Sequence, residues 1–125
     1  MDKLYFGAPL GSIKNILVSG FQPGDTLRSN LLEAMIDARN QVGLNRRFRP
    51  VVLVMEAPPH LKVVQKTDQG IVVVRGFSPV CLELFLIRID FRSPRLAKVS
   101  GTISPASLLD MDSYTTSSDQ KRASR

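Results

Sequence analysis

Residues 30–55, NLLEAMIDARNQVGLNRRFRPVVLVM, contain the change of pattern that decides the fold class. The first half has apolar residues at helical spacing, namely Leu31, Met35, Ala38 and Val42. Asn30 and Glu33 form a capping-box start, and Gly43 is the expected stop. The run of apolar residues at 51–55 is typical of a strand buried on both faces. The stretch therefore predicts a helix packed on a core, then a central strand.

The segment before this stretch predicts a strand and a short helix. Residues 3–7, KLYFG, form an apolar run ended by glycine, which favours a first strand. Ser12 is the expected cap of the helix that follows. Ile13 and Ile16 share one helical face, and Gly20 stands where a glycine stop is expected.

The segment after it predicts strands. Residues 61–65 and 71–74 flank the turn-forming residues 68–70 and read as a hairpin. A long strand at 82–92 and a short one at 99–103 are expected to follow. Strands and helices do not alternate along the chain, so we expect an α+β fold, with a small mixed or antiparallel sheet as the core and two N-terminal helices.

The length and composition predict one domain. With 125 residues, 43% hydrophobic and 22% charged, the chain can bury a core but does not accommodate two full domains. Residues 1–104 are expected to form this domain. Residues 105–125 are rich in Ser, Thr and Asp without periodicity, which predicts a disordered or loosely attached tail.

The single cysteine, Cys81, cannot form an intramolecular disulfide, and it reads as a small buried hydrophobe. A reducing compartment fits this best. No stretch approaches the roughly 18 apolar residues of a membrane helix, and the N-terminus lacks a signal-peptide run. We therefore expect a cytoplasmic protein, or one exported without a cleaved signal, with no membrane partner.

The charge predicts an anionic partner. The chain has 17 basic and 11 acidic side chains, which gives a net charge of +6. The whole excess of positive charge lies in residues 1–104. This favours a nucleic acid or another polyanion as partner. Arg46, Arg47, Phe48 and Arg49 can grip phosphates and stack a base, or they form a solvated loop. Arg88 and Arg92 share one side of their strand, which we interpret as a solvated face.

Few residues carry an evident chemistry. The chain has no P-loop, no Gly-x-Gly-x-x-Gly, no Cys-x-x-Cys pair and no Gly-x-Ser-x-Gly. His60 reads as an exposed turn residue, and one His with one Cys makes a zinc site unfavourable. If the strand alternation is unbroken, Glu83 lies on the apolar side with Phe85 and Ile87. Burial there would remove the carboxylate from water, which is typical of catalytic carboxylates. Otherwise it is an exposed carboxylate at a strand end.

Three groups of motifs resemble a known family. Tyr5-Phe6-Gly7-Ala8 followed by residues 13–21 is similar to the opening of the ADP-ribosyltransferase fold, where Tyr-His-Gly-Thr ends the first strand and Ile-Leu-x-x-Gly-Leu follows. Residues 46–53 resemble the loop Arg-His-Gly-Lys-Pro and the Val-Val-Leu strand of the RNA 2'-phosphotransferase branch. Residues 68–73 and 77–79 are similar to later segments of that branch. The resemblance covers roughly residues 4–86.

The resemblance implies a set of site residues. It gives Tyr5, Gly7 and Arg28 roles in NAD binding, with Gly7 letting the nicotinamide amide approach the backbone. Arg46 and Arg47 would bind the pyrophosphate or a substrate phosphate. Glu83, or else Glu56, would stabilise the ribose cation, which makes Glu83, Arg46 and Arg47 the catalytic candidates.

The chain also departs from the family pattern. Phe6 replaces the family's NAD-binding histidine, Ala8 its threonine and Arg47 its loop histidine. We therefore expect weak or absent NAD binding, and a binding module for a polyanion or a protein partner. An active NAD-dependent ADP-ribosyl or RNA 2'-phosphate transferase is the alternative, and an unrelated small α+β regulator stays open.

Overall fold

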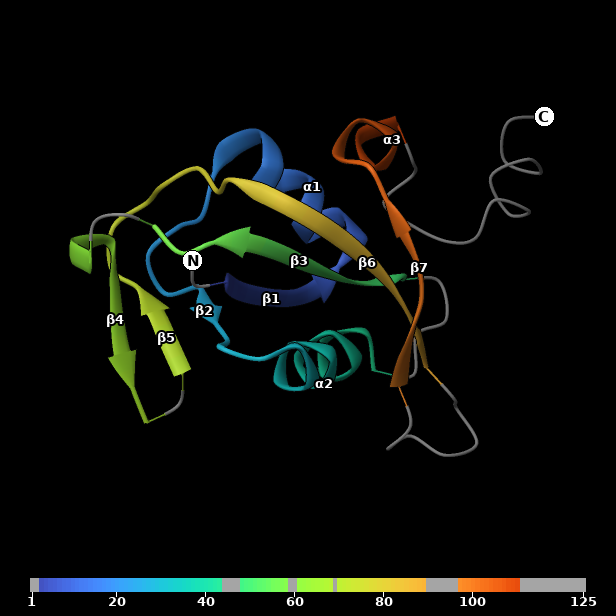
Figure 1. The fold of residues 1–125 in the computed structure, drawn as a ribbon, viewed down its shortest axis with the longest axis horizontal. Helices are drawn as coiled ribbons and strands as arrows, with labels where there is room; N and C mark the ends of the chain where they lie inside the picture. The colour runs from blue at the N-terminus through green and yellow to red at the C-terminus, as the bar shows by residue number, and fades with distance from the viewer. Residues whose placement is uncertain (1–2, 44–47, 59–60, 69, 90–96, 111–125) are drawn as a thin grey trace.

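A computed structural model describes residues 3–43, 48–58, 61–68, 70–89 and 97–110 (Figure 1). In chain order the elements are β1 (Lys3–Pro9), α1 (Leu10–Ser19), β2 (Thr26–Leu27), α2 (Leu31–Val42), β3 (Pro50–Glu56), a 3₁₀ turn η1 (Leu61–Val63), β4 (Val64–Thr67), β5 (Gly70–Val73), β6 (Cys81–Ile89), β7 (Ala97–Ile103) and α3 (Pro105–Asp110).

Four strands form the main sheet, in the order β1-β3-β6-β7, with antiparallel neighbours throughout. The apolar run at 51–55 lies in β3, between β1 and β6, so the predicted central strand is confirmed. All five residues of this run are buried, because elements cover the sheet on both faces here. Figure 1 shows β3 crossing the middle of the molecule.

A second, smaller sheet has the order β2-β5-β4 and is also antiparallel. The predicted hairpin is present as β4 and β5, with Thr67 opposite Gly70. Arg28, just after β2, forms an isolated antiparallel bridge with Tyr5 of β1. This bridge joins the small sheet to the edge of the main one.

The alternation of side chains in β1 and β3 gives the main sheet two apolar faces. The first is packed with α1, the small sheet and α3, and its largest fully buried side chains include Phe21, Leu10, Ile13, Leu53 and Leu108. The second is packed with α2 and contains Ala34, Met35, Val52, Val54 and Ile87. Figure 1 shows α1 and α2 on opposite sides of the sheet.

The ends of α2 are as predicted. The Asn30 side chain accepts a hydrogen bond from the Glu33 backbone N–H at 2.9 Å, and the helix ends at Gly43, whose φ is 61°. In α1, Gly20 also has a positive φ of 84°, as expected for its stop. Left-handed backbone of this kind is inexpensive only for glycine.

The predicted cap at Ser12 is wrong. Helix α1 begins at Leu10, two residues earlier, with Pro9 before it and no side-chain cap. β1 continues directly into α1, and the Leu10 N–H donates to the Arg49 carbonyl at 2.8 Å. The backbone carbonyl of the residue just before β3 therefore satisfies a donor at the helix start, and Ser12 lies within the first turn.

The predicted tail is also corrected in part. Residues 105–110 form α3, and Leu108 is fully buried in the core beside α1. The Leu108 N–H donates to the Ser104 carbonyl at 3.0 Å. One buried residue in a six-residue helix leaves no periodic signal, which is why the sequence pattern missed it. The rest of the predicted tail, 111–125, lies outside the described residues.

The fold is thus α+β, with antiparallel sheets and three α-helices in the described ranges, the third of which follows the sheet. None of the helices described is long and apolar enough to span a membrane.

Candidate functional site

A polar cleft with a volume of about 590 Å³ opens at the outer edge of β1, and we call it the α1–α2 cleft. Its described lining comes from β1, α1, β2, α2 and the connections on either side of β2. The residues are Phe6, Ser12, Asn15, Ile16, Ser19, Gly20, Gln22, Gly24, Asp25, Thr26, Arg28, Asp37 and Gln41.

One wall of the cleft is a face of α1. Ser12, Asn15 and Ser19 follow one another at intervals of three and four, which places them on one side of a helix. Leu10 and Ile13 are fully buried on the side that faces the core. Packing of the apolar side therefore turns hydroxyl and amide groups toward the cleft.

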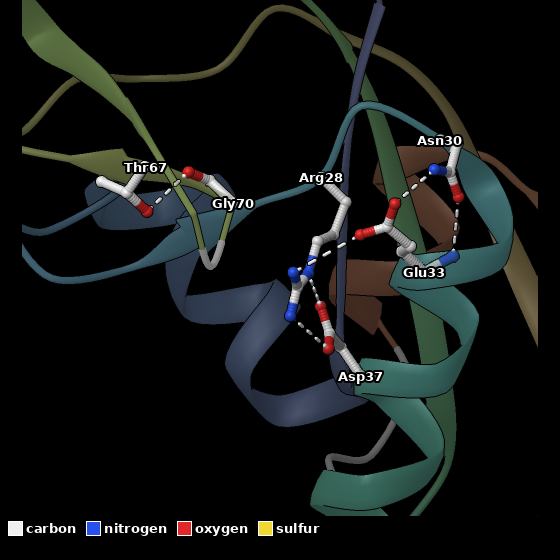
Figure 2. A network of polar contacts seen from close by, with 6 residues as sticks. All are labelled: Arg28, Asn30, Glu33, Asp37, Thr67 and Gly70. Carbon is white, nitrogen blue, oxygen red and sulfur yellow. Dashed lines mark hydrogen bonds and ion pairs between the residues drawn. The ribbon is translucent and has the colours of Figure 1, made fainter.

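Arg28 projects toward α2 from the edge of β1. It exchanges two backbone hydrogen bonds with Tyr5, at 2.7 and 2.8 Å, and partners in an antiparallel pair project to the same side. Its guanidinium donates to both Asp37 carboxylate oxygens, from Nε at 2.6 Å and from Nη2 at 3.0 Å. Nη1 lies 3.5 Å from Glu33 Oε2. Figure 2 shows Arg28 between the two α2 carboxylates.

These contacts define the electrostatics of Arg28. The Asp37 hydrogen bond raises the pKa of Arg28, burial opposes the rise, and the charges of Asp37 and Glu33 add to it. The guanidinium is thus held as a cation by two carboxylates. Arg28 lines the cleft as its predicted cofactor role requires, but the groups bound to its guanidinium belong to α2.

Gly7 has a packing role that the sequence did not predict. A Cβ at this position would lie 1.7 Å from the Ala34 carbonyl oxygen and 2.9 Å from the Ala38 nitrogen. The space above Gly7 that was predicted to admit nicotinamide is therefore occupied by the α2 backbone. On the strand edge, the Gly7 carbonyl accepts a hydrogen bond from Gln41 Nε2 at 3.1 Å.

Tyr5 is half-buried and packs against the apolar cluster under α2. Its backbone N–H and C=O both pair with Arg28. These contacts give Tyr5 a structural position beside the cleft, but it is not among the cleft's lining residues. Its predicted role in cofactor binding stays a prediction.

Glu83 lies away from the cleft. It pairs with Val54 in β3, which pairs with Tyr5 in β1, so two strand spacings, about 10 Å, separate Glu83 from Tyr5. Its side chain is exposed, so the desolvation expected for a catalytic acid is absent. The register shifts between Val54 and Met55, opposite the start of β6, and the apolar burial of β6 begins at Leu84. The structure thus supports the alternative prediction, that Glu83 is an exposed carboxylate at a strand end.

The other predicted residues are also placed apart from the cleft or undescribed. Arg46 and Arg47 lie outside the described residues, as does His60. Glu56, at the end of β3, lines a separate and mainly apolar crevice of about 170 Å³. Cys81 is half-buried, and desolvation raises the pKa of its thiol, which disfavours the nucleophilic thiolate.

Sequence reasoning missed most of the cleft. Asp37 was not among the predicted site residues, and its partner Arg28 lies nine positions earlier, before the helix begins. Ser12, Asn15 and Ser19 gave the one available signal, a polar stripe at helical spacing. Within the described ranges, no group of three His, Cys, Asp or Glu side chains is placed to hold a metal ion.

Comparison with protein-family models, with curated proteins and with solved structures finds no match for this chain.

Proposed function

We propose that this chain is a binding module with an ADP-ribosyltransferase-like fold, whose α1–α2 cleft takes a small polar molecule without catalysing its transfer. The observation that carries the proposal is the convergence of hydroxyl, amide and carboxylate groups from α1, α2 and the α1–β2 connection on one cleft. The order β1, α1, β2, α2, β3 and the quoted motifs support the family resemblance.

The lining suits a ligand with hydroxyl or amide groups. Ser12, Ser19 and Thr26 bring hydroxyls that both donate and accept, and Asn15 and Gln41 bring amides. Phe6 and Ile16 add apolar contacts. A volume of about 590 Å³ lies within the usual range of about 300–1,000 Å³ for small-molecule sites.

Two features argue against transfer chemistry. Phe6 and Ala8, which replace the family's histidine and threonine, are both buried, and Phe6 packs edge-on against Phe21 with ring centroids 5.2 Å apart. Glu83 is exposed and is not part of the cleft lining. We therefore expect NAD to bind weakly or not at all, without turnover.

The test is a calorimetric and NMR titration of the chain with nicotinamide, adenosine, ribose and NAD. Asn15→Trp should fill the cleft and abolish binding. Val18→Trp is the matched control, because Val18 lies on the same helix, is 73% exposed and does not line the cleft. Binding that persists in Asn15→Trp, or no binding of any compound, contradicts the proposal. NAD turnover that disappears in Glu83→Gln would restore the transferase alternative.

A second candidate function is polyanion binding, which the net charge of +6 favours. Such binding should weaken steeply with salt, in proportion to the phosphates neutralised. Replacing Arg46 and Arg47 by Ala should weaken it more than replacing Arg88 and Arg92. RNA binding that is insensitive to salt between low and physiological concentrations would exclude this candidate.

A further inference from the structure

We infer that the α1–α2 cleft selects an unphosphorylated ligand, neutral or cationic, such as a nucleoside or a carboxamide, and rejects the corresponding phosphate. This inference rests on the proposed function of the cleft and adds the chemical class of the ligand. It follows from the charges that line the cleft and from the groups that already occupy its phosphate-binding donors.

The charge of the lining is the first argument. Among the described residues of the cleft, Arg28 is the one cation, while Asp25 and Asp37 are anions. Asp37 is paired with Arg28, so Asp25 remains uncompensated within this set. Glu33 adds a further negative charge behind the guanidinium. A phosphate entering the cleft therefore meets a net negative charge from these described residues, and like charges oppose binding.

Asp25 is fixed in position, which makes its charge effective. Its Oδ2 accepts a hydrogen bond from the Gln22 N–H at 2.9 Å. Its backbone carbonyl accepts one from the Val73 N–H at 2.8 Å. The carboxylate is thus held by the turn and the backbone of Asp25 by β5, so turning the carboxylate away from a bound anion would break its bond to Gln22.

The donors that hold phosphates in other proteins are engaged here. Arginine binds a phosphate through its guanidinium fork, and the Arg28 fork is bound to Asp37 by two hydrogen bonds. Helix N-termini also bind phosphates. The start of α2, which is outside the cleft lining, is engaged as well: Asn30 accepts from the Glu33 N–H, and the Glu33 carboxylate itself lies at this end. A phosphate would have to displace a carboxylate in either place.

The experiment compares each nucleoside with its own phosphate at fixed ionic strength: adenosine with AMP, and nicotinamide riboside with its mononucleotide. By calorimetry, the nucleosides should bind the wild-type chain at least tenfold more tightly. Asp25→Asn keeps the acceptor for Gln22 and should reduce this ratio several-fold. Asp37→Asn should reduce it further, because it weakens the hold on Arg28.

The control variant is Asp68→Asn, which removes one charge at the exposed hairpin turn and should leave the ratio unchanged. Circular dichroism verifies that each variant is folded. If Asp37→Asn does not fold, Asp25→Asn alone tests the inference. A phosphate that binds as tightly as its nucleoside, or a ratio that Asp25→Asn leaves unchanged, overturns the inference but not the proposed function. If neither member of a pair binds, the proposed function fails and this inference with it.

Discussion

The contact between Gly7 and α2 gives the most direct test of the fold around the cleft. In Gly7→Ala the new Cβ would lie 1.7 Å from the Ala34 carbonyl oxygen and 2.7 Å from its carbonyl carbon. An ordinary contact begins at 3.4 Å, so α2 must withdraw by about 1.7 Å. The obstacle is main chain, so no change of rotamer relieves it.

The cost follows from what α2 buries. Ala34, Met35, Ala38 and Val42 are all at most 6% exposed, and they lose close packing if the helix withdraws. Inserting a methyl group into a packed core costs about 1–3 kcal/mol when side chains can adjust. Because the backbone must move here, we expect about 3 kcal/mol or more, against a total stability of about 5–15 kcal/mol for a domain.

Urea unfolding followed by circular dichroism measures this loss, and two other glycines provide controls. A Cβ at Gly101, in β7, would meet no atom within 4 Å, so Gly101→Ala should change the free energy of unfolding by less than about 1 kcal/mol. Gly24 has equal space but a φ of 99°, so Gly24→Ala should cost about 1–2 kcal/mol from backbone strain alone.

The reasoning is refuted if Gly7→Ala is as stable as Gly101→Ala. Shortening the Ala34 side chain should not rescue the variant, because the contact is with the carbonyl group. Rescue of Gly7→Ala by Ala34→Gly would therefore also contradict the geometry.

Three further predictions concern α3, the Arg28 ion pair and Cys81. Leu108→Ala should cost about 2–5 kcal/mol in urea unfolding, since Leu108 is fully buried, whereas the 42% exposed Leu109 should tolerate Ala; equal effects would show that α3 is not docked. A double-mutant cycle with Arg28→Ala and Asp37→Ala should give a coupling of about 1 kcal/mol, at the upper end for exposed pairs because this pair is bidentate and partly buried; additive losses would contradict the pairing. Because burial raises the pKa of the Cys81 thiol above its ordinary value, iodoacetamide should alkylate the folded chain more slowly than the unfolded one at pH 8. The unfolded thiol ionises first, so stability should fall as pH rises above about 9, and equal alkylation rates would exclude the shift.

The sequence predicted the elements whose signals are local. Helix α2 combines a cap at Asn30 with a regular apolar face, and both were readable within fourteen residues. β3 is an uninterrupted apolar run because it is covered on both faces. By contrast, the N-terminal boundary of α1 depends on Arg49, which is distant in sequence, and no local pattern could place it.

The site was less predictable because it too depends on contacts between residues that are distant in sequence. Glu83 was expected on the apolar face, but a residue's burial depends on what covers that position as well as on strand alternation. Gly7 was expected to let a ligand approach the backbone closely. Its neighbour is a helix in the structure, whereas the resemblance suggested a ligand, and glycine alone cannot distinguish the two.

Arg28 links the fold to the chemistry of the cleft. Its backbone joins the two sheets through Tyr5, and its side chain holds α2 through Asp37. A variant that released the guanidinium for a phosphate would also loosen the helix that packs on Gly7. The pairing that supports the position of α2 thus engages the one arginine among the described residues of the cleft, so the proposed preference for unphosphorylated ligands would follow from how the chain folds.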